Sequence, residues 1–160
     1  MGTLKLYDFS GIQRVDPAAL EAQLCGILDE YRKIIDVIIA SGSPFTWDGI
    51  ILPIEDMQSQ IDCICSPLAH LQMVANTDSI GEAHEKCVAR MSAFSAEMQQ
   101  NEDLYRAYVW RAASPEYAFY SAEQKRAIAL ALESFCLGGV PLPKKDKVRF
   151  RHISERLARF

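Results

Sequence analysis

The longest periodic stretch of the chain lies between Thr46 and Asn76, where apolar residues recur every three or four positions. Only a helix brings residues with this spacing to one side, because about 3.6 residues complete each turn. The predicted inward positions are Trp47, Ile50, Ile54, Met57, Ile61, Ile64, Leu68, Leu71 and Ala75. Ile51, Cys65 and Val74 widen this apolar stripe, so we expect neighbouring helices to cover it on more than one side.

Two prolines interrupt this stretch. Thr46 is a good N-cap, because its hydroxyl can accept a hydrogen bond from an amide of the first turn. Pro53 and Pro67 each remove an amide donor and crowd the carbonyl of the preceding turn. We therefore predict two or three kinked helical segments that follow one path.

Similar patterns flank the central stretch. One helix is predicted to begin at Asp16-Pro17, with the aspartate as cap and the proline at the first helical position, and to end at residues 41–44. Another begins within residues 76–79, where Ser79 and Glu82 have the spacing of a capping box and Thr77 is the alternative cap. The inward positions are Leu20, Leu24, Ile27, Tyr31, Ile34 and Ile38 in the first helix, and Ile80, His84, Cys87, Met91, Phe94 and Met98 in the second.

Three shorter helices are predicted in the last third of the chain. The first is capped by Asn101, ends at Ser114-Pro115 and carries Leu104, Tyr105, Tyr108 and Trp110. The second opens with the capping box of Ser121 and Gln124, buries Ile128, Leu132 and Phe135, and ends at Gly138-Gly139. The third begins near Lys144, and its apolar positions are Phe150, Ile153, Leu157 and Phe160. Because this pattern reaches the last residue without a stop signal, we expect a chain cut from something longer, with Leu157 and Phe160 incompletely covered.

The fold class follows from these patterns. No stretch alternates apolar and polar residues as a half-buried strand does, and no block recurs as in a repeat protein. We predict an all-α fold, a bundle of about six helices with a kinked central helix. The whole chain, 1–160, is expected to form one domain, with 16–160 as the bundle and 1–15 as an extended arm. The apolar residues of the arm expected to lie on the bundle are Tyr7, Phe9 and Ile12.

Composition narrows the class of protein. Hydrophobic residues make up 49% of the chain and charged residues 24%, without an apolar run long enough to cross a membrane. The start of the chain lacks the features of a secretory signal, so we expect a soluble cytoplasmic protein. The five cysteines, Cys25, Cys63, Cys65, Cys87 and Cys136, are odd in number and lie in helical patterns. They are predicted to be free buried thiols.

Charge is unevenly distributed. Residues 1–124 carry 18 acidic and 8 basic side chains, whereas residues 125–160 carry 3 acidic and 9 basic ones. We interpret the basic end as a solvated helix face, with a surface for acidic protein or nucleic acid as the alternative. We expect no nucleic-acid and no membrane partner.

The sequence contains no complete catalytic or metal-binding motif. It has no glycine-rich phosphate loop, no Gly-x-Ser-x-Gly and no Cys-x-x-Cys, and Cys63 and Cys65 point to different faces of a helix. His84-Glu85 begins like the zinc motif His-Glu-x-x-His, but Val88 occupies the position of the second histidine, and valine cannot coordinate a metal.

The three histidines are given structural interpretations. His84 is predicted to be packed in the core, His70 to satisfy a carbonyl freed by Pro67, and His152 to be exposed among arginines. No residue is therefore assigned a catalytic, cofactor-binding or metal-binding role.

The order of motifs resembles a known family. The chain is similar to the N-terminal helical region of the thimet oligopeptidase and oligopeptidase A family over roughly residues 8–160. The motifs that carry this resemblance are Thr46-Trp47, Pro53-Ile54-Glu55, Ser66-Pro67-Leu68-Ala69-His70-Leu71, Val74, Asn76, Gln100-Asn101-Glu102-Asp103-Leu104-Tyr105, Phe135-Cys136-Leu137-Gly138-Gly139-Val140-Pro141-Leu142-Pro143 and Arg156-Leu157. They are packing and turn motifs, and none is catalytic.

This resemblance implies a neurolysin-like peptidase fold, of which the chain would be the N-terminal part. Such enzymes are zinc metallopeptidases that cleave short peptides in a channel between two mostly helical halves. Their zinc ligands lie in a His-Glu-x-x-His helix and a further glutamate, which this sequence does not contain. The resemblance therefore implies no catalytic residue and no cofactor in this chain.

Three functional hypotheses follow. In the first, the chain is the non-catalytic N-terminal domain of an oligopeptidase A-like zinc metalloendopeptidase and forms part of the channel wall on the substrate-access side. In the second, the chain is a stand-alone helical interaction module derived from that family. In the third, the chain is an enzyme with an unfamiliar site. The partners implied by the resemblance are the catalytic domain or short peptides, and we expect a monomer or weak dimer.

Overall fold

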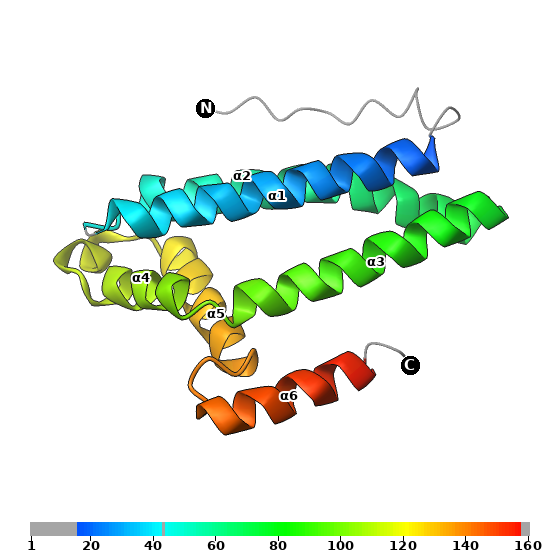
Figure 1. The fold of residues 1–160 in the computed structure, drawn as a ribbon. Helices are drawn as coiled ribbons and strands as arrows, with labels where there is room; N and C mark the ends of the chain where they lie inside the picture. The colour runs from blue at the N-terminus through cyan, green and yellow to red at the C-terminus, as the bar shows by residue number, and fades with distance from the viewer. Residues whose placement is uncertain (1–15, 43, 158–160) are drawn as a thin grey trace.

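Six α-helices and one 3-10 helix account for most of residues 16–42 and 44–157, the part of the chain that the computed structural model describes (Figure 1). They are α1 (Pro17–Ser41), α2 (Trp47–Val74), α3 (Asp78–Gln99), α4 (Glu102–Ala113), η2 (Pro115–Phe119), α5 (Ala122–Leu137) and α6 (Lys144–Leu157). No β-strand occurs among these described residues. The prediction of an all-α fold with about six helices is confirmed.

The three longest helices pack against one another. Figure 1 shows α1 and α2 side by side along most of their length, with α3 following them, and α1 contacts both of the others. The shorter α4, η2 and α5 gather at one end of these three helices, and α6 continues from α5 on the side of α3. The fold is thus a long three-helix body with a compact group of short helices at one end.

Most predicted caps form as expected. The side chain of Asp16 accepts a hydrogen bond from the Ala18 amide at 3.0 Å, and Thr46 accepts one from Gly49 at 3.0 Å. Asn101 caps α4 in the same way. The capping box of Ser121 and Gln124, the two residues predicted to open α5, has both of its hydrogen bonds.

The start of α3 differs from the capping box predicted at Ser79 and Glu82. Thr77 is the N-cap, and its hydroxyl accepts a hydrogen bond from the Ile80 amide at 3.3 Å. With the helix beginning at Asp78, that carboxylate lies in the first turn, where the positive end of the helix dipole stabilises it. The alternative cap was therefore the correct one.

The central stretch follows one helical path, as predicted. α2 runs from Trp47 to Val74 with Pro53 and Pro67 inside it. Each proline removes one backbone hydrogen bond, but α1 and α3 both pack against α2 and bury seven of its side chains. Packing on two sides outweighs the loss of two hydrogen bonds.

The buried positions partly match the predicted stripes. In α1 the predicted Leu24, Tyr31 and Ile38 are buried, but Leu28 and Ile35 are buried as well, while Ile27 and Ile34 are only half-buried. The stripe is displaced because α2 and α3 both contact α1. The buried side chains of α2 are Ile50, Ile51, Met57, Ile61, Ile64, Leu68 and Leu71.

The end of α2 also differs from the prediction. Val74 is 64% exposed and Ala75 is also exposed, although both were predicted to face inward. The helix ends at Val74, and the inward side of its last turn is covered at Leu71, while Val74 lies on the outer side. Cys65 is half-buried, as a position at the edge of the stripe should be.

All five cysteines are free, but only Cys87 is fully buried. Cys25 and Cys65 are half-buried, and Cys63 and Cys136 are exposed, so the prediction of buried thiols was wrong for these last two. None of the described helices combines the length and apolarity needed to span a membrane.

Two sequence-based expectations concern residues or side chains that the structure does not describe. One is the extended arm of residues 1–15 with Tyr7, Phe9 and Ile12, and the other is the incomplete cover of Leu157 and Phe160.

Candidate functional site

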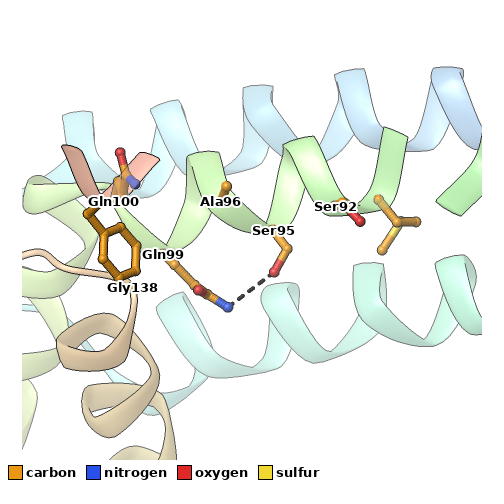
Figure 2. A pocket seen from close by; sticks show the side chains of 8 residues that line it. Ser92, Ser95, Ala96, Gln99, Gln100 and Gly138 are labelled. Atoms are coloured by element: carbon orange, nitrogen blue, oxygen red, sulfur yellow. Dashed lines mark hydrogen bonds between the residues drawn. The ribbon is translucent and has the colours of Figure 1, made fainter. Parts of the chain in front are cut away.

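A pocket of about 450 Å³ lies beside the C-terminal half of α3, where α5 ends and α6 passes (Figure 2). Its lining comes from three segments of the chain that are far apart in sequence. The lining residues are Met91, Ser92, Ser95, Ala96, Gln99, Gln100, Gly138 and Phe150. The last turns of α3 therefore form one side, and the other side is formed by the residue after α5 and by the ring of Phe150.

Two glycines allow this arrangement. A Cβ atom on Gly138 would lie 2.5 Å from the Cβ of Gln99, a distance that atoms in proteins do not adopt. Gly139 has φ of 87°, a conformation that costs little only for glycine, and a Cβ atom there would lie 3.3 Å from the ring of Phe150. The sequence predicted Gly138-Gly139 as the end of a helix. The structure shows in addition that these two glycines allow the ends of α3 and α5 and the ring of Phe150 to lie close together.

The pocket lining mixes hydroxyl, amide and apolar groups and has no ionisable side chain. The amide of Gln99 donates a hydrogen bond to the hydroxyl of Ser95 at 3.1 Å, as Figure 2 shows. No histidine or carboxylate lines the pocket to take a proton from Ser92 or Ser95. The lining therefore offers no ionisable side chain as a general base for either serine.

An ion pair anchors α6 next to this pocket. Lys147 pairs with Glu102 at the start of α4, and the Lys147 side chain is only 16% exposed. Lys145 and Arg149 on the same helix are exposed, as the interpretation of a solvated basic face requires. The basic helix is thus attached to the acidic part of the same molecule through one of its lysines.

A second polar centre is built around Arg111, which is 1% exposed and lies on the inward face of α4. Its Nη1 donates a hydrogen bond to the carbonyl oxygen of Phe45 at 3.1 Å and forms an ion pair of 2.8 Å with Glu116 of η2. The Nε and Nη2 atoms are buried and have no hydrogen-bond partner within the described part of the chain.

Aromatic rings surround this arginine. The guanidinium carbon lies 4.8 Å from the centre of the Tyr120 ring, a cation–π geometry. Tyr120 in turn packs against Trp47 at 5.5 Å, and Phe45 packs against Trp110 at 5.8 Å. Both tryptophans of the chain therefore lie at this end of the molecule.

Arg111 is not among the residues that the sequence pattern singled out. One signal was available, since Arg111 continues the helical spacing of Leu104, Ala107 and Tyr108, which are all buried. An arginine in an apolar stripe indicates a buried charge that needs partners. Those partners come from the loop before α2 and from η2, which periodicity within one helix cannot show.

The structure places the three histidines apart from one another. His70 is exposed, and its ring makes no hydrogen bond to the described residues, so it does not satisfy a carbonyl as predicted. His84 is half-buried on α3, less than a core histidine should be. His152 on α6 is exposed, as predicted.

The thiols of Cys65 and Cys87 lack the properties of nucleophiles. Burial, with smaller contributions from Cys87 and Asp62, raises the pKa of Cys65 to about 11. Burial likewise raises the pKa of Cys87. Both thiols stay protonated near neutral pH, and the thiolate is the reactive form.

The residues present do not fit the zinc site implied by the family resemblance. Val88 is 49% exposed on α3 and follows His84-Glu85 where a second histidine would be required. Residues 16–42 and 44–157 contain no group of three or more His, Cys, Asp or Glu side chains that could hold a metal ion.

Comparison with known proteins gives concordant matches. A family model described as the neurolysin/thimet oligopeptidase N-terminal domain matches residues 23–147. Oligopeptidase A of Escherichia coli (strain K12) is 32% identical over 146 residues, which cover 91% of this chain and 21% of that protein. Oligopeptidase A of Salmonella typhimurium is also 32% identical, over 158 residues that cover 98% of this chain and 22% of that protein. The chain thus spans about a fifth of the length of these relatives.

Proposed function

The chain belongs to the neurolysin/thimet oligopeptidase family through that family's N-terminal domain, and from this premise we propose that it serves as the non-catalytic domain of an oligopeptidase A-like peptidase. In this role it forms part of the wall of a substrate channel, on the side where peptides enter. The residues that bind zinc and cleave peptides would belong to the rest of such a peptidase, because this sequence has no complete His-Glu-x-x-His motif.

The observation that carries the proposal is the open pocket beside α3. Its lining is made of small polar, amide and apolar groups without an ionisable side chain, which suits contact and not catalysis. Leu137, next to the pocket residue Gly138, is 71% exposed, and Ile153, one turn after Phe150, is 47% exposed. Exposed apolar side chains around a hollow are typical of a surface that another part of a protein covers.

The name of the relatives supports a substrate class for the proposed enzyme. By their name, the matched proteins act on oligopeptides, so we propose short peptides as the substrates of the complete enzyme. We also propose that residues 1–160 act as one domain in the cytoplasm. The pocket surface would then contact the catalytic part, and the partner of this chain would be that part or a bound peptide.

A chimera tests this role directly. The matching N-terminal segment of Escherichia coli oligopeptidase A is replaced by this chain, and hydrolysis of a short fluorogenic peptide is measured. We expect the chimera to cleave the peptide, whereas a chimera that carries an unrelated helical bundle of equal length does not. A folded chimera without activity would contradict the proposal.

Two point variants refine the test. Leu137→Asp and Ile153→Asp should weaken the activity of the chimera, since each places a charge on the surface to be covered. Leu52→Asp is the matched control, because Leu52 is 51% exposed on α2. The alternative, a stand-alone interaction module, would be favoured if the reading frame that encodes this chain does not continue into a His-Glu-x-x-His sequence.

A further inference from the structure

The side chain of Arg111 leaves one edge of its guanidinium unused. A guanidinium presents two parallel N–H donors along its Nε–Nη2 edge, the geometry that matches the two oxygens of a carboxylate. In Arg111 these are the two atoms without a partner among the described residues, although the side chain is only 1% exposed. Buried charged donors without partners are costly, so a vacant edge of this kind requires an explanation.

Arg32 shows what occupies this edge elsewhere in the same chain. Its Nε donates to Glu97 Oε1 at 3.1 Å and its Nη2 donates to Glu97 Oε2 at 2.8 Å, while its Nη1 donates to Asp29 at 2.8 Å. Arg32 therefore has one carboxylate on Nη1 and a second carboxylate on the Nε–Nη2 edge. Arg111 has the first of these, Glu116 on Nη1, and lacks the second.

We propose that the Nε–Nη2 edge of Arg111 is a binding site for a carboxylate group of a ligand. The ligand carboxylate completes the arrangement seen at Arg32. The ring of Tyr120 lies over the guanidinium, and Trp47 packs against Tyr120. The site is independent of the proposed place of this chain in a peptidase.

Access to the site depends on the segment after α4. The Glu116 side chain is 70% exposed, and η2, on which it lies, is only five residues long. Phe119 at the end of η2 is 90% exposed, so no described residue holds this end by covering its ring. A movement of η2 and Tyr120 away from α4 uncovers the guanidinium and admits the ligand.

The carboxylate can come from two sources. One is the C-terminus of a peptide, and the other is an aspartate or glutamate side chain of a protein. Both present the same planar pair of oxygens, so the proposal concerns their shared chemistry, and the experiment separates them.

The first experiment observes the group itself in the unaltered 160-residue chain. The Nε–H resonance of Arg111 is followed by NMR while sodium acetate is added, with sodium chloride at equal ionic strength as the reference. We expect a saturable shift of this resonance with acetate and none with chloride. A resonance that does not move, or that moves equally with both salts, would overturn the proposal.

Three variants make the assignment specific, with tryptophan fluorescence as the readout because Trp47 contacts Tyr120 over the site. Arg111→Met should abolish the saturable response to acetate, and Arg111→Lys should weaken it about tenfold or more, because lysine lacks the paired donors. Glu116→Gln should tighten binding several-fold, since it removes a negative charge beside the ligand. Arg106→Met, at a residue 68% exposed on the same helix, is the control and should respond like the unaltered chain.

Peptide probes distinguish the two sources. Tri-alanine with a free C-terminus is compared with its amide, and with an acetylated, amidated Ala-Glu-Ala. Binding of only the free tripeptide identifies a site for peptide C-termini, and binding of only the glutamate peptide identifies a site for acidic side chains. Equal binding of the amide, which has no carboxylate, would overturn the proposal. If Arg111→Met does not fold, as judged by circular dichroism, the NMR titration and Arg111→Lys decide the outcome.

Discussion

Gly138 lies so close to Gln99 that a Cβ atom on the glycine would come within 2.5 Å of the glutamine Cβ and 2.8 Å of its carbonyl oxygen. The end of α5 thus touches the end of α3 without a side chain between them. Gly138 has φ of −70°, an ordinary helical value. Glycine is therefore required here because a Cβ atom does not fit, and not because of the backbone conformation. Both residues line the pocket beside α3, so this close contact forms part of its wall.

Gly138→Ala should destabilise the protein by about 1–3 kcal/mol, because overlap with backbone atoms forces a shift of α3 or α5. Gly26→Ala is the matched control. A Cβ atom on Gly26, inside α1, would meet no other side chain and no other helix within 4 Å, so alanine there should add about 0.5–1 kcal/mol by its higher helix propensity. Denaturant unfolding measures both changes, and similar values for the two variants would show that Gly138 is not tightly enclosed.

Ile61→Ala should reduce the free energy of unfolding by about 2–5 kcal/mol, since Ile61 is 1% exposed and its removal leaves a cavity between long helices. Leu52→Ala on the same helix should have a much smaller effect, because Leu52 is 51% exposed. A loss below about 0.5 kcal/mol for Ile61→Ala in a urea titration would contradict the packing of α2.

Tyr31→Phe should make the protein less sensitive to alkaline pH. Burial, with a smaller contribution from Glu55, raises the pKa of Tyr31 to about 12, whereas an unfolded tyrosine titrates near about 10. The stability that Tyr31 contributes is therefore complete below the unfolded pKa and is lost as pH rises through the folded one. Thermal unfolding at a series of alkaline pH values tests this, and an unchanged slope in the variant would contradict it.

Glu21→Gln should flatten the loss of stability at acid pH. The hydrogen bond from Arg90 to Glu21, 2.8 Å long, lowers the pKa of this carboxyl, against a smaller opposing effect of burial. Glu21 therefore contributes stability above its unfolded pKa that is lost as pH falls through the lower, folded value. Unfolding midpoints at a series of acid pH values should fall less steeply in the variant, and parallel curves would show that this ion pair does not contribute.

The purified chain should bind no stoichiometric zinc and should cleave no peptide. The ground for this expectation is the sequence, in which Val88 replaces the second histidine after His84-Glu85. Metal analysis after purification in zinc-containing buffer, together with a fluorogenic peptide assay, provides the measurement. One tightly held zinc per chain with hydrolysis that a chelator stops would overturn it.

Local signals predicted much of the fold. Asp16, Asn101 and Ser121 cap the helices that follow them, because a cap depends only on a side chain and an amide two or three residues later. The choice between Thr77 and Ser79 was open for the same reason, since both offer a hydroxyl at a suitable spacing. Only the observed hydrogen bond to Ile80 decided it.

Packing between helices determined features of α1 and α2 that the periodicity of a single helix could not predict. Pro53 and Pro67 weaken α2 when the helix is considered alone, yet α1 and α3 pack against α2 and the helix continues through both prolines. Leu28 and Ile35 are buried because α1 is covered by two helices, and a single-helix pattern shows only one face.

The candidate sites also depend partly on local sequence and partly on tertiary packing. The sequence by itself determined that the chain is helical, where its helices begin, and which family its motifs resemble, because these depend on neighbours along the chain. Only the tertiary structure brought Phe45 and Glu116 to Arg111, and Gly138 to Gln99. Such contacts join residues from different helices and loops. The distances between these residues depend on how whole helices pack, and the spacing of residues along the sequence does not specify that packing.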